Sequence, residues 1–217
     1  MSTFARIALA ALLCHTSSAA LAAAAASVTV QVHDAGGKAL PDVAVYAEPD
    51  GAAAPKLTRA GEIEQRGLQF VPLMTVIQVG NQIAFPNNDK VRHHIYSFSP
   101  AHKFDQKLYA GVAAAPQVFD KAGTVVLGCN IHDKMLAYVR VVETPYYGKT
   151  DAAGAVKIEL PAGKYTLKAW HYHGVGGQPS EQALTVKAGE AAAAGFKLAL
   201  KPPPADGENA AAESNRL

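Results

Sequence analysis

The sequence predicts an all-β protein, and three observations support this fold class. Apolar and polar residues alternate over short stretches, as at Val28, Val30 and Val32, with the period of a half-buried strand. Glycine, proline and asparagine separate these stretches at short intervals. After the first segment, no apolar pattern with the helical period continues for long. We therefore expect a protein built from β-sandwiches.

The first segment, residues 1–26, has the features of a secretory signal peptide. Arg6 supplies a positive charge, residues 7–13 form a short apolar run, and alanine-rich cleavage frames follow. The run is too short to span a bilayer. Lipid attachment at Cys14 is rejected because Leu13 stands where a small residue is required. We therefore expect a periplasmic or secreted protein.

Export would leave a single cysteine in the mature chain. The sequence has two cysteines, and Cys14 would leave with the leader. An odd cysteine in an exported protein forms an intermolecular disulfide, remains a reactive thiol or binds a metal. Cys129 is therefore the most diagnostic residue. The formal net charge of +2 gives no support to nucleic-acid binding.

The two ends of the mature chain share a pattern of short alternating apolar and polar stretches separated by turns. Residues 28–45 alternate on either side of an Asp-Ala-Gly-Gly turn, which predicts a hairpin, and residues 50–60 have the composition of a linker. Alternation returns after Pro145, and a second hairpin is predicted around residues 187–190. Residues 201–217 begin with Lys-Pro-Pro-Pro and continue with small and polar residues, which predicts a disordered tail.

The middle of the chain predicts a second set of strands, separated by Gly-Asn, Pro-Asn-Asn-Asp and Lys-Ala-Gly turns. These strands are expected at residues 76–79, 83–85, 93–98, 117–119, 124–127 and 136–142.

The loop before the last of these strands carries the chemistry. Cys129, His132 and Met135 have a Cys-x-x-His-x-x-Met spacing. Soft sulfur ligands with imidazole suit copper, and two His, one Cys and a weak axial Met form the ligand set of a copper electron-transfer site. The second imidazole would come from His93 or His94, which face opposite sides of a strand. A core methionine and a surface histidine are the alternative interpretations, but neither explains an unpaired Cys129.

Residues 63–142 resemble the cupredoxin family, of the plastocyanin and amicyanin type. The matching pieces are Phe70-x-Pro72, Phe85-x-Asn87, His93 and the Cys129 loop, whose compact spacing is similar to that of amicyanin. The resemblance implies a Greek-key sandwich with one copper per chain, as Cu(I) or Cu(II).

The ligands that this resemblance implies are His93, Cys129, His132 and Met135, with His94 as the alternative to His93. His94 stands where the family has asparagine, and Asp133 stands where proline is common. We expect an imidazole N–H of His94 to replace the asparagine in tying its strand to the ligand loop.

Residues 28–45, 150–154 and 160–167 resemble a carboxypeptidase-regulatory-like (transthyretin-like) β-sandwich. This resemblance predicts that the cupredoxin-like unit is inserted into that sandwich. The predicted divisions are a signal peptide 1–26, an outer part 27–61, a cupredoxin domain 62–143, the remaining outer part 144–200 and a disordered tail 201–217. One large sandwich is the alternative. The whole chain is similar to bacterial methylamine utilization proteins, which implies a pathway.

The expected function is that of an electron carrier and not an enzyme, with transient redox-protein donors and acceptors, no nucleic acid and no membrane span. Copper storage or delivery, and a structural or surface-interaction role, are the alternatives. An oxidase or reductase would need a second copper, for which only His171 and His173 are candidates. An aromatic corner at a strand end is the other interpretation of that pair.

Overall fold

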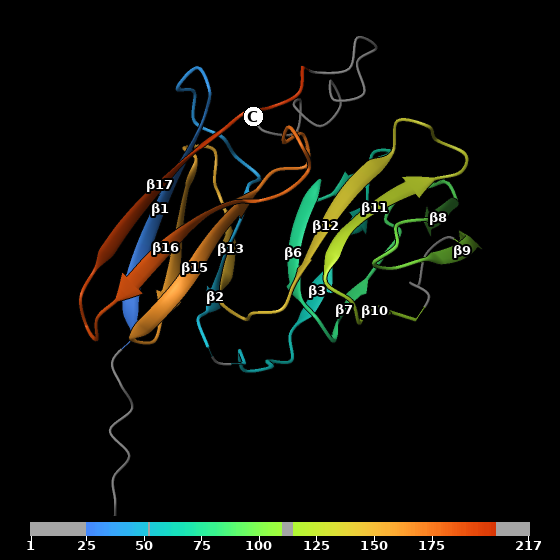
Figure 1. Ribbon diagram of the computed structural model, residues 1–217. Helices are drawn as coiled ribbons and strands as arrows, with labels where there is room; N and C mark the ends of the chain where they lie inside the picture. Colours follow the sequence, from blue (N-terminus) through green and yellow to red (C-terminus); the bar gives the residue numbers. More distant parts are fainter. Residues whose placement is uncertain (1–24, 52, 110–114, 203–217) are drawn as a thin grey trace, which may run out of the picture.

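The computed structural model describes residues 25–51, 53–109 and 115–202, and their regular structure consists of β-strands (Figure 1). The predicted all-β class is confirmed. Within these ranges, no helix has the length and apolar character needed to cross a bilayer. Residues 1–24 of the predicted signal peptide and residues 203–217 of the predicted tail lie outside the described residues.

Strands from the two ends of the chain pair with each other and form a unit that we call the outer sandwich (Figure 1). One sheet has the order β14-β1-β17, with β1 parallel to β17 and antiparallel to β14. The second sheet has the order β13-β2-β15-β16. The strands are β1 (Ala26–Asp34), β2 (Ala44–Pro49), β13 (Tyr147–Lys149), β14 (Ala155–Leu160), β15 (Gly163–Trp170), β16 (Ser180–Val186) and β17 (Ala192–Leu198).

The two hairpins predicted in this unit do not form. β1 and β2 approach only near the turn, where His33 and Ala39 make an isolated bridge, and the chain then crosses to the other sheet through Asp42 with a φ of 57°. Likewise, β16 pairs with β15 while β17 pairs with β1. The physical reason is burial, because the apolar faces of Val30 and Val45 meet across one core, whereas an isolated hairpin leaves a face exposed.

The strands between residues 60 and 142 pair among themselves and form a unit that we call the inner sandwich. Its large sheet has the order β6-β12-β11-β8-β9, and its small sheet has the order β10-β7-β3, with β4 and β5 paired separately. The strands are β3 (Ala60–Glu62), β4 (Glu64–Gln65), β5 (Phe70–Val71), β6 (Met74–Gln78), β7 (Asn81–Ala84), β8 (His93–Ser97), β9 (Phe104–Tyr109), β10 (Gln117–Phe119), β11 (Gly123–Cys129) and β12 (Leu136–Val142). The described strands therefore do not join into one large sandwich.

Both faces of β12 are covered, which explains how the two sandwiches meet. Ala137, Val139 and Val141 point into the core of the inner sandwich. Tyr138 and Val142 belong to a separate apolar cluster shared with the outer sandwich. The large inner sheet is therefore packed against the β13-β2-β15-β16 sheet, and Figure 1 shows β6 and β12 on the side toward the outer sandwich.

Arg140 of β12 links the two sandwiches through its guanidinium. It donates to the Tyr46 hydroxyl at 2.9 Å and to the Thr124 hydroxyl at 3.0 Å. The guanidinium carbon also lies 5.1 Å from the centroid of the Trp170 ring, within the range of a cation–π contact. The same side chain thus contacts β11 in the inner sandwich and β2 and β15 in the outer one.

We predict that Arg140→Met lowers the free energy of unfolding by about 1–3 kcal/mol, because it removes two hydrogen bonds and a cation–π contact while keeping an apolar stem. Urea denaturation of the metal-free protein measures this. Arg66→Met, on an exposed side chain, serves as the control and should change stability by less than about 0.5 kcal/mol. Equal losses in both variants would show that Arg140 does not stabilise the junction.

Candidate metal centre

The pairing of β8 with β11 places two of the predicted ligands. Cys129 is the last residue of β11 and lies opposite Ile95 of β8 in the antiparallel register. Alternate residues of a strand share a face, so His93 points into the same interior as Ile95. Both are fully buried, and Cys129 is 3% exposed. The structure thus brings His93, at the start of β8, next to the cysteine.

His132 completes the group from the loop between β11 and β12. The sulfur of Cys129 lies 3.7 Å from His93 Nδ1 and 3.6 Å from His132 Nδ1. The two Nδ1 atoms are 3.2 Å apart. Within the described part of the chain, these three side chains form the one cluster of His, Cys, Asp or Glu whose donor atoms converge closely enough for a metal ion.

The spacing of the three atoms fits a single metal ion. A point equidistant from them lies about 2.0 Å from each, close to a metal–imidazole bond of about 2.0–2.1 Å and slightly below a metal–thiolate bond of about 2.3 Å. Burial of His93 and Cys129 also restricts what else their donor atoms can contact, because buried polar atoms need partners inside the protein. The donor set of one sulfur and two imidazoles is therefore chemically and sterically suited to a metal.

His94 lies on the other side of its strand from the cluster. Its ring pairs with the carboxylate of Asp105 on β9. The prediction that the His94 imidazole forms a hydrogen bond with the ligand loop is therefore wrong. The tie is made by the backbone, since the Asn130 N–H donates to the His94 carbonyl at 3.1 Å, and this bond does not depend on the side chain at position 94.

Met135 closes the loop and is buried. Its N–H donates to the His132 carbonyl at 2.9 Å, and 1% of the residue is exposed. It packs in the same apolar cluster as Cys129. This position agrees both with an axial thioether and with a methionine that fills the core.

Asp89 holds the side of His93 that faces away from Cys129. Its carboxylate lies 2.8 Å from His93 Nε2 and accepts the N–H groups of Gly67 at 2.6 Å and Leu68 at 3.0 Å. Burial raises the pKa of Asp89, but the hydrogen bonds from Leu68, His93 and Gly67 together outweigh it and leave the pKa below its ordinary value. Asp89 is therefore a carboxylate near neutral pH and accepts a hydrogen bond from the Nε2–H group of His93.

Tyr109 of β9 pairs with His93 in the antiparallel register and lies beside the site. Burial raises the pKa of Tyr109 to about 12, while hydrogen bonds to glutamine side chains oppose the increase. The hydroxyl therefore stays protonated and donates a hydrogen bond to the Phe85 carbonyl at 2.5 Å. Asp89 lies only four residues before His93, but its fixed position depends on the distant Gly67 and Leu68, and the contacts of Tyr109 are also distant in sequence, so local patterns did not indicate either role.

His171 and His173 do not form a comparable site. They follow the end of β15, where the His173 N–H donates to His171 Nδ1 at 3.1 Å. The His171 ring stacks on Tyr172 with centroids 4.1 Å apart, and Tyr172 stacks on Tyr138 of the inner sandwich at 4.4 Å. This arrangement agrees with the aromatic corner and adds a contact between the sandwiches.

No protein-family model matches this sequence, and no curated protein matches it. Among solved structures, it is similar to the copper-containing nitrite reductase of Thermus scotoductus SA-01, with 25% identity and a TM-score of 0.37 over 44% of this chain and 25% of that chain. It is similar to a mutant of amicyanin in the oxidised state, with 17% identity and a TM-score of 0.36 over 38% and 82%. It is also similar to a purple cupredoxin from Nitrosopumilus maritimus, with 23% identity and a TM-score of 0.34 over 38% of this chain and 99% of that chain. The match thus spans a quarter of the nitrite reductase chain.

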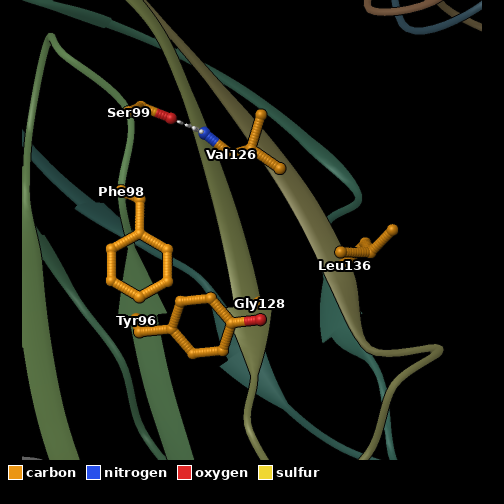
Figure 2. Close-up of a pocket in the computed structure, with 6 residues that line it drawn as sticks. All are labelled: Tyr96, Phe98, Ser99, Val126, Gly128 and Leu136. Carbon is orange, nitrogen blue, oxygen red and sulfur yellow. Dashed lines mark hydrogen bonds between the residues drawn. The ribbon is translucent and has the colours of Figure 1, made fainter.

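The residue before Cys129 is covered by an aromatic ring on the opposite face of the sheet. Figure 2 shows a shallow pocket beside β8, β11 and β12, where the Tyr96 ring lies over Gly128. A Cβ built on Gly128 would lie 2.8 Å from Tyr96 Cζ and 2.9 Å from its hydroxyl oxygen. Gly128 therefore lets the ring pack flat against the strand that presents the sulfur.

We predict that Gly128→Ala destabilises the metal-free protein by about 1–3 kcal/mol, the usual cost of overpacking, because the tyrosine ring must move. Thermal or urea unfolding measures the change. Gly128→Ala combined with Tyr96→Leu should lose less than the sum of the two single variants, since the clash is gone. Strict additivity would contradict the steric explanation.

Proposed function

We propose that this protein is an exported copper-binding electron carrier whose inner sandwich is of the cupredoxin type. The observation that carries the proposal is the convergence of Cys129 Sγ with the Nδ1 atoms of His93 and His132 inside the protein. Copper is the metal that this donor set favours, because a thiolate and two imidazoles with a nearby thioether form the ligand set of copper electron-transfer sites. When bound, copper would supply a centre that gains and loses one electron.

The protein's own contribution is to hold the donors in place. Hydrogen-bonded strands carry His93 and Cys129, and the Asn130 N–H bond to His94 fixes the loop that carries His132. Ligands held by strand pairing move little when the charge of the site changes, and small rearrangement favours rapid electron transfer. Met135 and the neighbouring core side chains keep water from the inner side of the site.

The route for electrons would be the side of the site nearest solvent. His132 is partly exposed, in contrast to the fully buried His93. Ile131 next to it is 48% exposed and supplies apolar surface for a redox-protein donor or acceptor. A small contact of this kind suits transient redox complexes. Export to the periplasm, through the leader at residues 1–26, belongs to this proposal.

Burial of the donors separates this function from copper storage or delivery. A delivery site must release its metal to a partner or chelator, whereas His93 and Cys129 are inside the inner core. Catalytic turnover would require a second copper centre, and the candidate pair His171 and His173 is engaged in an aromatic corner. Electron transfer is therefore the function that the geometry supports best.

Titration of the metal-free protein with Cu(II) tests the proposal. We expect an intense thiolate-to-copper charge-transfer band in the visible that saturates at one copper per chain, and we expect Cys129→Ser to abolish it. A wild-type protein that stays colourless would remove the assignment.

His93→Gly should weaken the visible band and His94→Gly should leave it largely intact, because only His93 faces the sulfur. A normal band that a chelator bleaches within minutes would indicate storage or delivery.

Met135→Leu tests whether Met135 would help to hold a copper ion. We expect the visible band to remain and the reduction potential to rise, because loss of a thioether donor disfavours the divalent ion. Protein-film voltammetry measures the potential. Val139→Leu, elsewhere in the same buried cluster, is the control for repacking alone. The same potential in wild type and Met135→Leu would assign Met135 to the core only.

A further inference from the structure

The two neighbouring histidines of β8 each pair with a carboxylate, but in very different surroundings. Asp89 lies 2.8 Å from Nε2 of His93, in a pair whose side chains are 0% exposed for the histidine and 13% for the aspartate. Asp105 pairs with His94, and there the exposed fractions are 19% and 61%. An electrostatic interaction is stronger where water is excluded. The Asp89 carboxylate therefore acts on a histidine that has no water around it.

The Asp89 pair also determines which nitrogen of His93 is available. A carboxylate only accepts hydrogen bonds, so the proton of the neutral ring lies on Nε2. Nδ1 then carries the lone pair and faces Cys129 Sγ at 3.7 Å and His132 Nδ1 at 3.2 Å. A ring with the proton on Nδ1 would present an N–H to the site and would not bind a metal there.

Asp89 is itself held in place by hydrogen bonds to residues other than His93. The Gly67 and Leu68 N–H groups both donate to it, and the two residues have left-handed backbone angles, with φ of 64° and 61°. The Asn87 side chain accepts the N–H of Asp89 at 3.0 Å and donates to the Val91 carbonyl at 2.9 Å. The carboxylate is therefore placed by two segments, residues 67–68 and residues 87–93, and is not free to turn away from His93.

From these contacts we propose that Asp89 is a positioning residue of the metal centre, which fixes the Nε2–H tautomer and the orientation of His93 and favours the divalent over the monovalent state of a bound copper ion. This inference rests on the proposed copper function. The negative charge of Asp89 makes Nδ1 of the His93 imidazole a stronger electron-pair donor to the metal. A stronger electron-pair donor stabilises Cu(II) more than Cu(I). The same carboxylate–histidine–metal arrangement raises ligand basicity in other metal sites.

Asp89→Asn tests the charge, because the amide oxygen can still accept from Nε2–H. We expect Cu(II) binding to weaken by about 10- to 100-fold, the range found when such partners are removed, with a smaller loss for Cu(I). The reduction potential should therefore rise. Asp89→Glu keeps the charge and should restore a potential closer to that of wild type. Asp105→Asn removes the same charge from the neighbouring histidine and should leave both affinities unchanged.

Equal effects of Asp89→Asn and Asp105→Asn would overturn the proposal, since they would reflect only the net charge near the site. A parallel loss of Cu(I) and Cu(II) binding, with no change in potential, would assign Asp89 a purely structural role and would also overturn it.

The tautomer of His93 provides a test that needs no variant at position 89. Long-range ¹H–¹⁵N correlation spectra of the metal-free wild-type protein near neutral pH should show Nε2 protonated and Nδ1 unprotonated, with His93→Gln used to assign the signal. A proton on Nδ1 would contradict the proposal. If the tautomer is as expected but wild type forms no coloured copper complex, the proposed function fails, and the copper part of this inference fails with it.

Discussion

The antiparallel pairing of β8 with β11 is the constraint on which the candidate site depends. It sets Ile95 opposite Cys129. Because His93 lies two residues before Ile95, it shares a face with Ile95 and points toward the sulfur, whereas His94 points to the opposite face. A shift of one residue in this register would turn His93 outward and His94 inward, because strand neighbours point to opposite faces. The backbone bond from Asn130 to His94 holds the register at the point where the strand becomes the ligand loop.

Around that pairing, partly buried polar groups orient the metal-binding side chains. Asp89 and Tyr109 contact the site from two different segments, and each is hydrogen-bonded to the backbone of a further one. Buried polar groups that are fully paired specify a single arrangement, whereas unpaired ones are costly. The carboxylate beside His93 also places a negative charge next to a site that is suited to a cation.

The outer sandwich contributes through β12, the strand that leaves the ligand loop. Its residues alternate between the inner core and the junction with the outer sandwich, where Arg140 and Tyr138 contact aromatic side chains. A strand buried on both faces is less free to bend than one with a solvated face. The outer sandwich therefore acts as a support for the sheet that carries Cys129.

Local patterns in the sequence determined the all-β class, most strand positions in the middle of the chain and the donor types at Cys129 and His132, because alternation and short spacings are properties of neighbouring residues. They also showed that His93 and His94 face opposite sides. Only the tertiary structure decided that His93 is the inner one, that the two predicted hairpins open across a core, and that Asp89 reaches the Gly67 turn 22 residues away. These outcomes depend on which distant strands pair, and local sequence does not contain that pairing since burial is decided by the assembled sheets.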